Sequence, residues 1–193
     1  MSQSLSVVCG VSNRHLHLSQ TDLEILFGTG ATLSNIRELG QPGQYACEEQ
    51  VNLVGPKSTL RNVRVLGPVR KQTQVEISLT DSFALGIKPP LRDSGDLAGS
   101  AGLTLEGPAG KIELTEGVIL AKRHVHFHPK DAEPLGIRDK DIISAAVSGD
   151  RALVFEGVLA RVHESFALEF HVDIDEANAA LLKTGDVVIV SKH

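Results

Sequence analysis

The chain has 193 residues and a formal net charge of −5, with 41% hydrophobic and 22% charged residues, a balance typical of a folded globular protein. The acidic charge and the lack of a Lys/Arg-rich run argue against nucleic-acid binding, and no apolar run approaches the roughly 20 residues of a membrane span. Two cysteines, Cys9 and Cys47, are too few for a disulfide framework. Because the start, MSQSLSVVCG, also lacks the features of a signal peptide, we expect a cytoplasmic protein.

Short runs of β-branched and apolar residues recur along the chain, separated by Gly, Pro or Asp. In chain order, the segments that we expect to be strands are 5–12, 60–69, 73–79, 101–107, 111–127, 141–149, 151–162, 166–174 and 185–192. Such short, closely spaced strands favour barrels or sandwiches over βαβ units.

Three segments carry helix signals. LSQTDLEILFG has Ser19 as an expected N-cap and Gly28 as an expected stop, and HPKDAEPLG (128–136) has the same form with a proline in its first turn. DIDEANAALLKTGD (173–186) is the third, with Asp175 as the expected cap and Gly185 as the stop.

These signals occur twice in the same order. RHLHLSQTDLEILFG (14–28) matches RHVHFHPKDAEPLG (123–136), and VEISLTDSFALGIK (75–88) overlays FHVDIDEANAALLK (170–183). A repeat of this kind indicates a duplicated unit. The sequence therefore predicts a mainly β protein of two duplicated β-barrel domains with short capping α-helices.

The repeated Arg-His-x-His motif is the strongest chemical signal. Residues i and i+2 of a strand share a face, so two imidazoles of one motif can reach one small cation. The repeat offers a third ligand at one aligned place in each copy. The two predicted metal half-sites are His15, His17 and Glu76, and His124, His126 and His171. Three protein ligands with a vacant position are typical of a catalytic metal. The alternative is that each His-x-His is a pair of surface histidines that duplication copied.

The other histidines and Cys47 lack this support. His128 is expected to lie on the surface or behind the ligands, His163 and His193 to be solvated, and Cys47 to be a buried thiol.

Two features are suited to binding an anion. Arg70 shares a face with Glu76 if the strand between them is unbroken, and a guanidinium beside a metal can hold two phosphate oxygens. LRDSGDLAGSAG (91–102) is a small-residue loop with Ser94, whose hydroxyl and neighbouring N–H groups could bind an oxyanion. An exposed arginine and a plain glycine-rich turn are the alternatives. No nucleophile, dinucleotide or P-loop motif is present in the sequence.

Six stretches of the chain together resemble the PduL-type phosphate acyltransferases (phosphate propanoyltransferases), nearly end to end. They are SNRHLHLS, GQPGQYACEEQV, GPVRKQTQVEISLTD, LRDSGDLAGS, KRHVHFHPKDA and EFHVDIDEANA. The resemblance implies reversible transfer of a short acyl group, propanoyl or acetyl, from acyl-CoA to phosphate, which gives acyl phosphate and CoA. It also implies a homodimer with a dinuclear zinc site, two Zn²⁺ per chain, between two barrels: residues 14–121, and residues 122–193 completed by strand 5–13.

The resemblance also assigns roles to residues. It places the metal ligands on the six residues named above, makes Arg70 the catalytic arginine of the phosphate site, and makes Ser94 a phosphate contact. The matching coenzyme A positions are Ser12, Arg37, Arg64, Leu66 and Asn178. We see no N-terminal helix of the kind that targets some family members to microcompartments. The alternatives are a zinc-dependent acyl-CoA thioester hydrolase and a non-catalytic, ligand-binding barrel.

Overall fold

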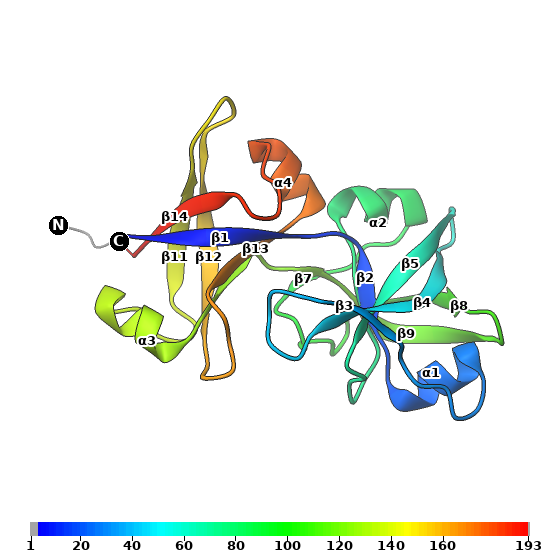
Figure 1. The fold of residues 1–193 in the computed structure, drawn as a ribbon. Coiled ribbons are helices and arrows are strands. Elements are labelled where there is room, and N and C mark those ends of the chain that lie inside the picture. The colour runs from blue at the N-terminus through cyan, green and yellow to red at the C-terminus, as the bar shows by residue number, and fades with distance from the viewer. Residues whose placement is uncertain (1–3, 193) are drawn as a thin grey trace. The chain divides into compact units, whose positions relative to one another are not determined.

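The described chain, residues 4–192 of a computed structural model, divides into two units, each built around a closed ring of six strands (Figure 1). The first, here called the C-terminal barrel, holds the chain up to Ser12, the short segment Gly40–Pro42 and the chain from Lys122 onward. The second, here called the N-terminal barrel, holds Asn13–Leu39 and Gly43–Ala121. The sequence analysis had assigned Gly40–Pro42 to the barrel of residues 14–121, whereas the structure groups this segment with the C-terminal barrel.

The C-terminal barrel closes in the order β1-β13-β10-β12-β11-β14. Its strands are β1 (Ser4–Ser12), β10 (His124–Phe127), β11 (Ile142–Val147), β12 (Leu153–Val162), β13 (Glu169–Asp173) and β14 (Val187–Ser191). Its helices are α3 (Pro129–Ala132), the 3₁₀ turn η1 (Glu133–Leu135) and α4 (Ile174–Ala180). Phe127 and Phe170 are the largest fully buried side chains of its core.

The N-terminal barrel closes in the order β4-β5-β2-β6-β9-β8, because β8 pairs with both β4 and β9. Its ring strands are β2 (His15–His17), β4 (Tyr45–Val54), β5 (Thr59–Gly67), β6 (Gln74–Glu76), β8 (Ala101–Glu106) and β9 (Lys111–Ala121). Outside the ring, β3 (Asn35–Glu38) pairs with β4 and β7 (Leu91–Arg92) with β9, and the helices are α1 (Gln20–Phe27) and α2 (Leu79–Leu85). Leucines and valines such as Leu16, Leu53 and Val65 fill the core.

The two rings are equivalent strand by strand. In each, the His-x-His strand runs parallel to one neighbour (β5 or β12) and antiparallel to the other (β6 or β13), and the remaining pairs also agree in direction. Each ring takes the strand that precedes the other copy's His-x-His strand. Strand β1, which precedes β2, completes the ring of β10–β14, and β9, which precedes β10, completes the ring of β2, β4, β5, β6 and β8. The predicted mainly β fold with duplicated barrels is confirmed.

The helix signals are confirmed with one correction. Ser19 caps α1 and Gly28 ends it, and α3 with η1 ends at Gly136. The third expected helix starts earlier than predicted, because Asp173 and not Asp175 is the N-cap of α4. It also ends at Leu181 rather than at Gly185. Asp173 forms a capping box with Glu176, which fixes the earlier start.

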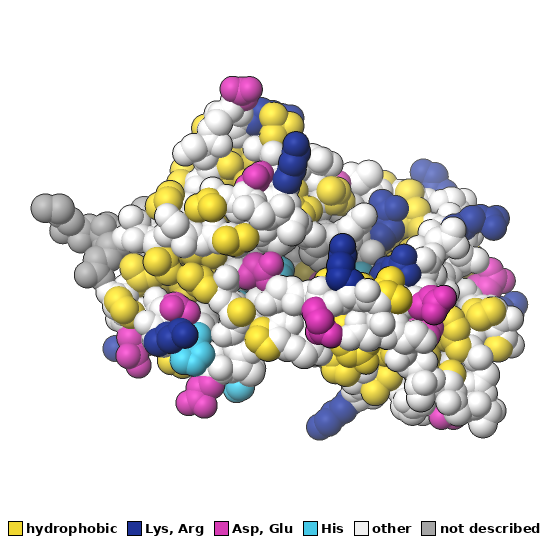
Figure 2. Space-filling view, in the orientation of Figure 1, with side chains coloured by type: hydrophobic (Ala, Val, Ile, Leu, Met, Phe, Trp, Pro, Cys, Tyr) yellow, Lys and Arg dark blue, Asp and Glu magenta, His cyan; other side chains and the backbone are white. Residues whose placement is uncertain are grey.

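Strands β3 and β4 were missed from the sequence. The run EEQ in the middle of β4 hides its pattern, although Cys47, Val51 and Leu53 point into the core. On the outside of the C-terminal barrel, Figure 2 shows hydrophobic side chains gathered over β1 and β14, where Val8, Val187 and Ile189 are exposed.

Candidate metal centres and phosphate site

The N-terminal barrel brings His15, His17 and Glu76 together through strand register. In the antiparallel pair β2–β6, His15 lies opposite Glu76 and His17 lies opposite Gln74. Cross-strand neighbours point to the same side of a sheet, so the three side chains converge. One ligand atom from each lies within 4.8 Å of the others, and His15 Nε2 is 3.5 Å from Glu76 Oε2.

The C-terminal barrel repeats this arrangement with His124, His126 and His171. His124 lies opposite His171 in the antiparallel pair β10–β13, and their rings are stacked with centroids 5.0 Å apart. The His126 and His171 rings are 4.9 Å apart, and one nitrogen of each of the three histidines lies within 4.8 Å of the other two.

Hydrogen bonds fix which nitrogen of the first histidine in each motif carries the proton. His15 Nδ1 lies 2.8 Å from Asn13 O, and His124 Nδ1 lies 2.8 Å from Lys122 O. Because a carbonyl oxygen only accepts, each Nδ1 is the donor, and in a neutral ring Nε2 keeps its lone pair for a cation. The two motifs therefore prepare their first ligand in the same way.

The second histidine of each motif is held neutral. Burial lowers the pKa of His17 to about 3, and the neighbouring His15 and Arg70 lower it further. Burial also lowers the pKa of His126 to about 2, and His124 acts in the same direction. Nδ1 of each ring is buried with no hydrogen-bond partner among residues 4–192. A buried lone pair without a donor is costly, and a metal ion would satisfy it. Both clusters fit a bound cation by this test.

Glu76 is kept ionised by its surroundings. Burial raises the pKa of its carboxyl, but His15, His17, a hydrogen bond from Ser94 and Arg70 outweigh burial and hold that pKa well below its usual value. The side-chain amide of Gln74 also donates to Glu76. Glu76 is therefore available as an anionic ligand.

Arg70 and Ser94 lie beside this cluster, although not as expected. The strand between Arg70 and Glu76 is broken, since β6 begins only at Gln74, so the predicted shared face was wrong. The backbone of Arg70 instead forms an isolated parallel β-bridge with Ser19. Its side-chain Nη1 lies 3.4 Å from Ser94 Oγ, and this hydroxyl donates to Glu76 at 3.0 Å. The guanidinium and the cluster are thus linked through the Ser94 hydroxyl.

Gln74 was missed from the sequence and holds this network in place. Its Nε2 donates to Ser94 Oγ at 2.8 Å, and its Oε1 accepts from Gly95 N at 2.8 Å. The Gly95 N–H therefore donates to Gln74 within the protein. The sequence had suggested that N–H groups of this loop could bind an oxyanion, and this one is already in use. The repeat could have revealed this position, because Gln74 and Glu169 each stand two residues before the third ligand.

The arginine that opens each Arg-His-x-His motif has a structural role that we had not predicted. Arg14 forms two contacts with the buried Asp81 at the start of α2, of 2.9 and 2.7 Å. Arg123 contacts Glu176 at the start of α4 at 2.6 Å. Both acids occupy the third position of a capping box, so each arginine ties the two-histidine strand to the helix that follows the third ligand.

The remaining candidates are placed as follows. Arg37, Arg64 and Leu66 lie in the N-terminal unit, where Arg64 donates to Cys47 O and Glu48 O, and Ser12 and Asn178 lie in the C-terminal unit. A role for any of these five in coenzyme A binding stays a prediction.

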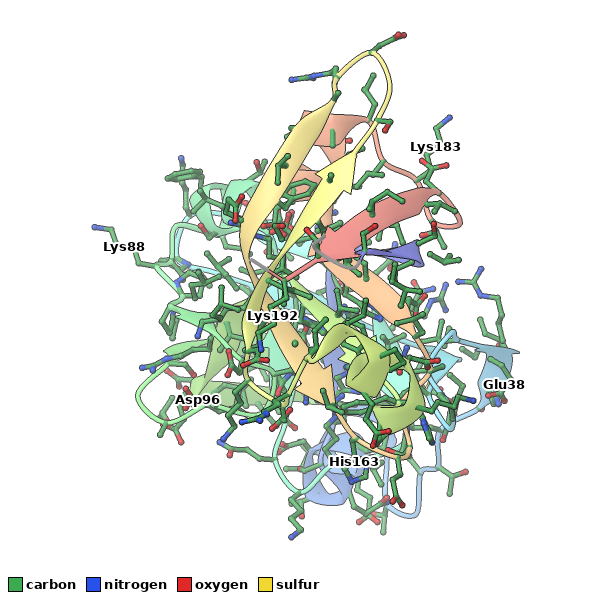
Figure 3. The ribbon with its side chains drawn as sticks, turned by 90° about the vertical axis from the view of Figure 1, so that its left-hand side faces the viewer. Glu38, Lys88, Asp96, His163, Lys183 and Lys192 are labelled. Atoms are coloured by element: carbon green, nitrogen blue, oxygen red, sulfur yellow. The ribbon has the colours of Figure 1, made fainter. Side chains whose placement is uncertain are left out.

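Of the other histidines, His128 caps α3, accepting from Lys130 N, and His163 lies on the exposed loop after β12 beside Ser165 (Figure 3). His193 is outside the described residues. Burial raises the pKa of the Cys9 thiol to about 12 and that of Cys47 to about 11, so neither is a ready thiolate.

Comparison with known proteins decides the family. The family model for phosphate propanoyltransferase matches residues 8–183, a span that contains both clusters, Arg70 and Ser94. The chain belongs to the phosphate propanoyltransferase family. The resemblance noted from the sequence is thereby confirmed, and the family is one of acyltransferases.

Curated relatives agree over almost the full chain. The phosphate propanoyltransferase of Thermotoga maritima is 62% identical over 185 residues, 95% of this chain and 88% of that protein. Those of Rhodopseudomonas palustris and Clostridioides difficile are 53% and 49% identical, cover 96% and 94% of this chain, and match 82% and 87% of their own lengths. Among the described residues, every helix is too short or too polar to cross a bilayer.

Proposed function

We propose that this protein transfers a short acyl group, propanoyl or acetyl, reversibly between coenzyme A and inorganic phosphate. The observation that carries the proposal is the Arg70–Ser94–Glu76 connection, which sets a guanidinium beside a cluster suited to a cation. Membership of the phosphate propanoyltransferase family supports the same reaction.

Each cluster is proposed to bind one Zn²⁺, two per chain. The donor sets are His15, His17 and Glu76, and His124, His126 and His171. Imidazole and carboxylate donors suit zinc, and three protein ligands leave one position for substrate. A Zn²⁺ in such a site supplies Lewis-acid polarisation of a neighbouring oxygen or sulfur.

The residues of the N-terminal barrel account for the handling of phosphate. A phosphate oxygen attacks the thioester carbonyl carbon, the new C–O bond forms as the C–S bond breaks, and the thiolate of coenzyme A leaves. Arg70 holds two oxygens of the attacking phosphate through its planar fork and offsets their charge. Ser94 Oγ, which Gln74 holds in place, accepts from Arg70 Nη1 and so orients the guanidinium beside the cluster. This fixed geometry lowers the entropic cost of joining two substrates.

A thiol-release assay tests this reaction. Purified zinc-loaded protein, given acetyl-, propanoyl- or butanoyl-CoA, should release free thiol only when phosphate is present, with acyl phosphate formed in equal amount. Thiol release without phosphate would show the hydrolase alternative, and no release in either condition would show the non-catalytic one. Either result would contradict the proposal.

Replacement of Arg70 tests the phosphate site itself. Arg70→Ala should lower turnover on the order of 10²–10³-fold, the usual effect of removing one charge-stabilising group, while two zinc ions stay bound. Arg61→Ala, an exposed arginine on β5, is the matched control and should keep full activity. Unchanged turnover in Arg70→Ala would exclude the assigned role.

The proposed homodimer has a candidate surface on the C-terminal barrel. Val8, Val187 and Ile189 are 46%, 56% and 40% exposed on the paired strands β1 and β14. The corresponding pair of the N-terminal barrel, β8 and β9, presents exposed charges at Glu106 and Lys111 instead. Burial in a dimer interface would therefore remove apolar surface from water at the β1–β14 face, but not at the charged positions of β8 and β9.

A further inference from the structure

Glu169 is a carboxylate beside the C-terminal cluster that neither the sequence nor the family name assigns to a role. It lies on β13, opposite His126 on β10 and two residues before His171, so it shares the face of the ligands. Its Oε2 is 3.0 Å from Nε2 of His171, and its side chain is only 14% exposed.

Two glycines make room for this carboxylate. A Cβ added to Gly10 on β1 would lie 2.6 Å from Glu169 Oε1, and a Cβ added to Gly40 would lie 2.5 Å from Oε2. Neither glycine has the positive φ that would itself require glycine. A side chain at either position would therefore displace the Glu169 carboxylate from this place.

Gln41 fixes the carboxylate from the other side. Ala167 N donates to Gln41 Oε1 at 3.2 Å, which leaves the amide nitrogen free to donate to Ala167 O at 3.0 Å and to Glu169 Oε2 at 2.9 Å. The orientation of the amide is thus set by backbone groups of both kinds. The segment Gly40–Pro42, an excursion of the chain between β3 and β4, supplies this contact to the C-terminal barrel.

We propose that Glu169 is a positioning residue for His171. Gln41 holds its Oε2 3.0 Å from Nε2, a buried nitrogen that makes no aligned hydrogen bond to the described residues, and in the zinc-loaded protein the carboxylate accepts the proton of Nε2 so that Nδ1 faces the metal. Carboxylates in this place commonly fix the tautomer and the orientation of a metal-binding histidine. His15 and His124 are hydrogen-bonded to a backbone carbonyl through Nδ1, whereas Nε2 of His171 lies 3.0 Å from a side-chain carboxylate without an aligned hydrogen bond. The inference rests on the proposed metal function of the C-terminal cluster.

The duplicated copy supports this assignment. Gln74 occupies the equivalent position of the N-terminal barrel and donates to Glu76, the third ligand there. In both copies the residue two before the third ligand therefore lies against it with a polar group of complementary character, hydrogen-bonded in the N-terminal barrel and 3.0 Å away in the C-terminal barrel. An anionic ligand receives a donor, and an imidazole ligand receives an acceptor.

Zinc titration of the metal-free full-length protein tests the inference without an activity measurement. In competition with a chromophoric chelator, wild type should bind two Zn²⁺ per chain. Glu169→Ala should weaken one of the two sites by about 10–100-fold, the usual effect of losing such a partner. Glu169→Gln keeps an acceptor oxygen and should restore the affinity to within about fivefold of wild type, because the role needs an acceptor and not a ligand charge.

One control and two further variants complete the zinc titration. Glu164→Ala removes an exposed carboxylate of the same unit and should leave both sites unchanged. Gly40→Ala and Gln41→Ala leave Glu169 in the sequence but displace or release its carboxylate, so each should weaken the same single site. These variants also provide the test if Glu169→Ala does not fold.

The tautomer of His171 gives a second, independent measurement. Long-range ¹H–¹⁵N spectra of the zinc-loaded protein should show His171 protonated at Nε2 in wild type. Protonation at Nδ1, or an equal loss of zinc in Glu169→Gln and Glu169→Ala, would overturn the positioning role. Wild type that binds no zinc would refute the proposed metal centres instead. Two unchanged sites in Glu169→Ala would refute only this inference.

Discussion

The two barrels each have one carboxylate at the cluster, on the strand of the third cluster residue, but at different positions. In the N-terminal barrel the sequence is Gln74-Val-Glu76, so the carboxylate is in the ligand cluster and an amide supports it. In the C-terminal barrel it is Glu169-Phe-His171, so an imidazole is in the cluster and the carboxylate lies behind it. Each copy therefore has one carboxylate at its cluster, within the cluster in the N-terminal barrel and beside it in the C-terminal barrel.

The surroundings of the second histidine differ more strongly. Arg70 lies near His17 and contributes to its low pKa. In the C-terminal barrel the ring of Phe166 packs on His126 with centroids 4.3 Å apart. Arg161, which lies over the Phe166 ring, also lowers the pKa of His126, so each cluster has an arginine nearby. Only Arg70 is linked to its cluster through a serine hydroxyl, and phosphate chemistry is therefore expected beside the first cluster.

Matched ligand replacements are the strongest test of this comparison. His15→Ala and His124→Ala should each release one of the two metals and weaken binding at that site by on the order of 10³-fold, more than the loss of an outer partner. Elemental analysis after dialysis measures the change. Loss of both metals from either variant would show that the clusters are not independent binding sites.

The two arginine contacts should differ in their effect on stability. Asp81 is 3% exposed and Glu176 is 22% exposed. Arg14→Met leaves a buried carboxylate unpaired and should lower the free energy of unfolding by about 3 kcal/mol, whereas Arg123→Met should lower it by about 1 kcal/mol. Urea denaturation measures both values. Asp81→Asn should recover part of the stability lost in Arg14→Met, and equal losses in the two single variants would contradict the comparison.

The proposed dimer surface belongs to only one barrel. Val187→Lys places a charge on the exposed β14 face and should raise the dimer dissociation constant at least about tenfold, equivalent to about 1.4 kcal/mol. Light scattering across a dilution series measures the change. Thr115→Lys on β9, at the exposed outer face of the N-terminal barrel, is the control and should leave assembly unchanged. A similar shift in both variants would remove the distinction between the two faces.

The smallest expected effect concerns the two thiols, one in each core. Cys9 and Cys47 are fully buried, and burial raises the pKa of each well above neutral. At pH 8 neither should react with iodoacetamide over minutes, since little thiolate forms and access is blocked. Mass spectrometry of the native protein measures this. Rapid labelling of one cysteine would show that its barrel opens readily.

The sequence was sufficient to predict which residues come together in the two clusters, because they depend on local spacing and on the repeat. His15 and His17 share a strand face by the two-residue period, and Glu76 follows from overlaying the second copy on the first. The helices of the Ser19 and His128 segments were also found locally, from caps and glycine stops. Strand β4 was missed because Glu48, Glu49 and Gln50 obscure its apolar face.

The contacts between distant segments were decided only by the tertiary structure. The pairing of Arg14 with Asp81 and the contact of Gln41 with Glu169 join residues far apart in the chain, whereas the place of strand 5–13 in the C-terminal barrel was expected from the family resemblance. Spacing cannot reveal such partners, because they depend on how the rings close. Residue type and period set by themselves which side chains could bind a cation, whereas barrel closure determined which groups hold those side chains in place.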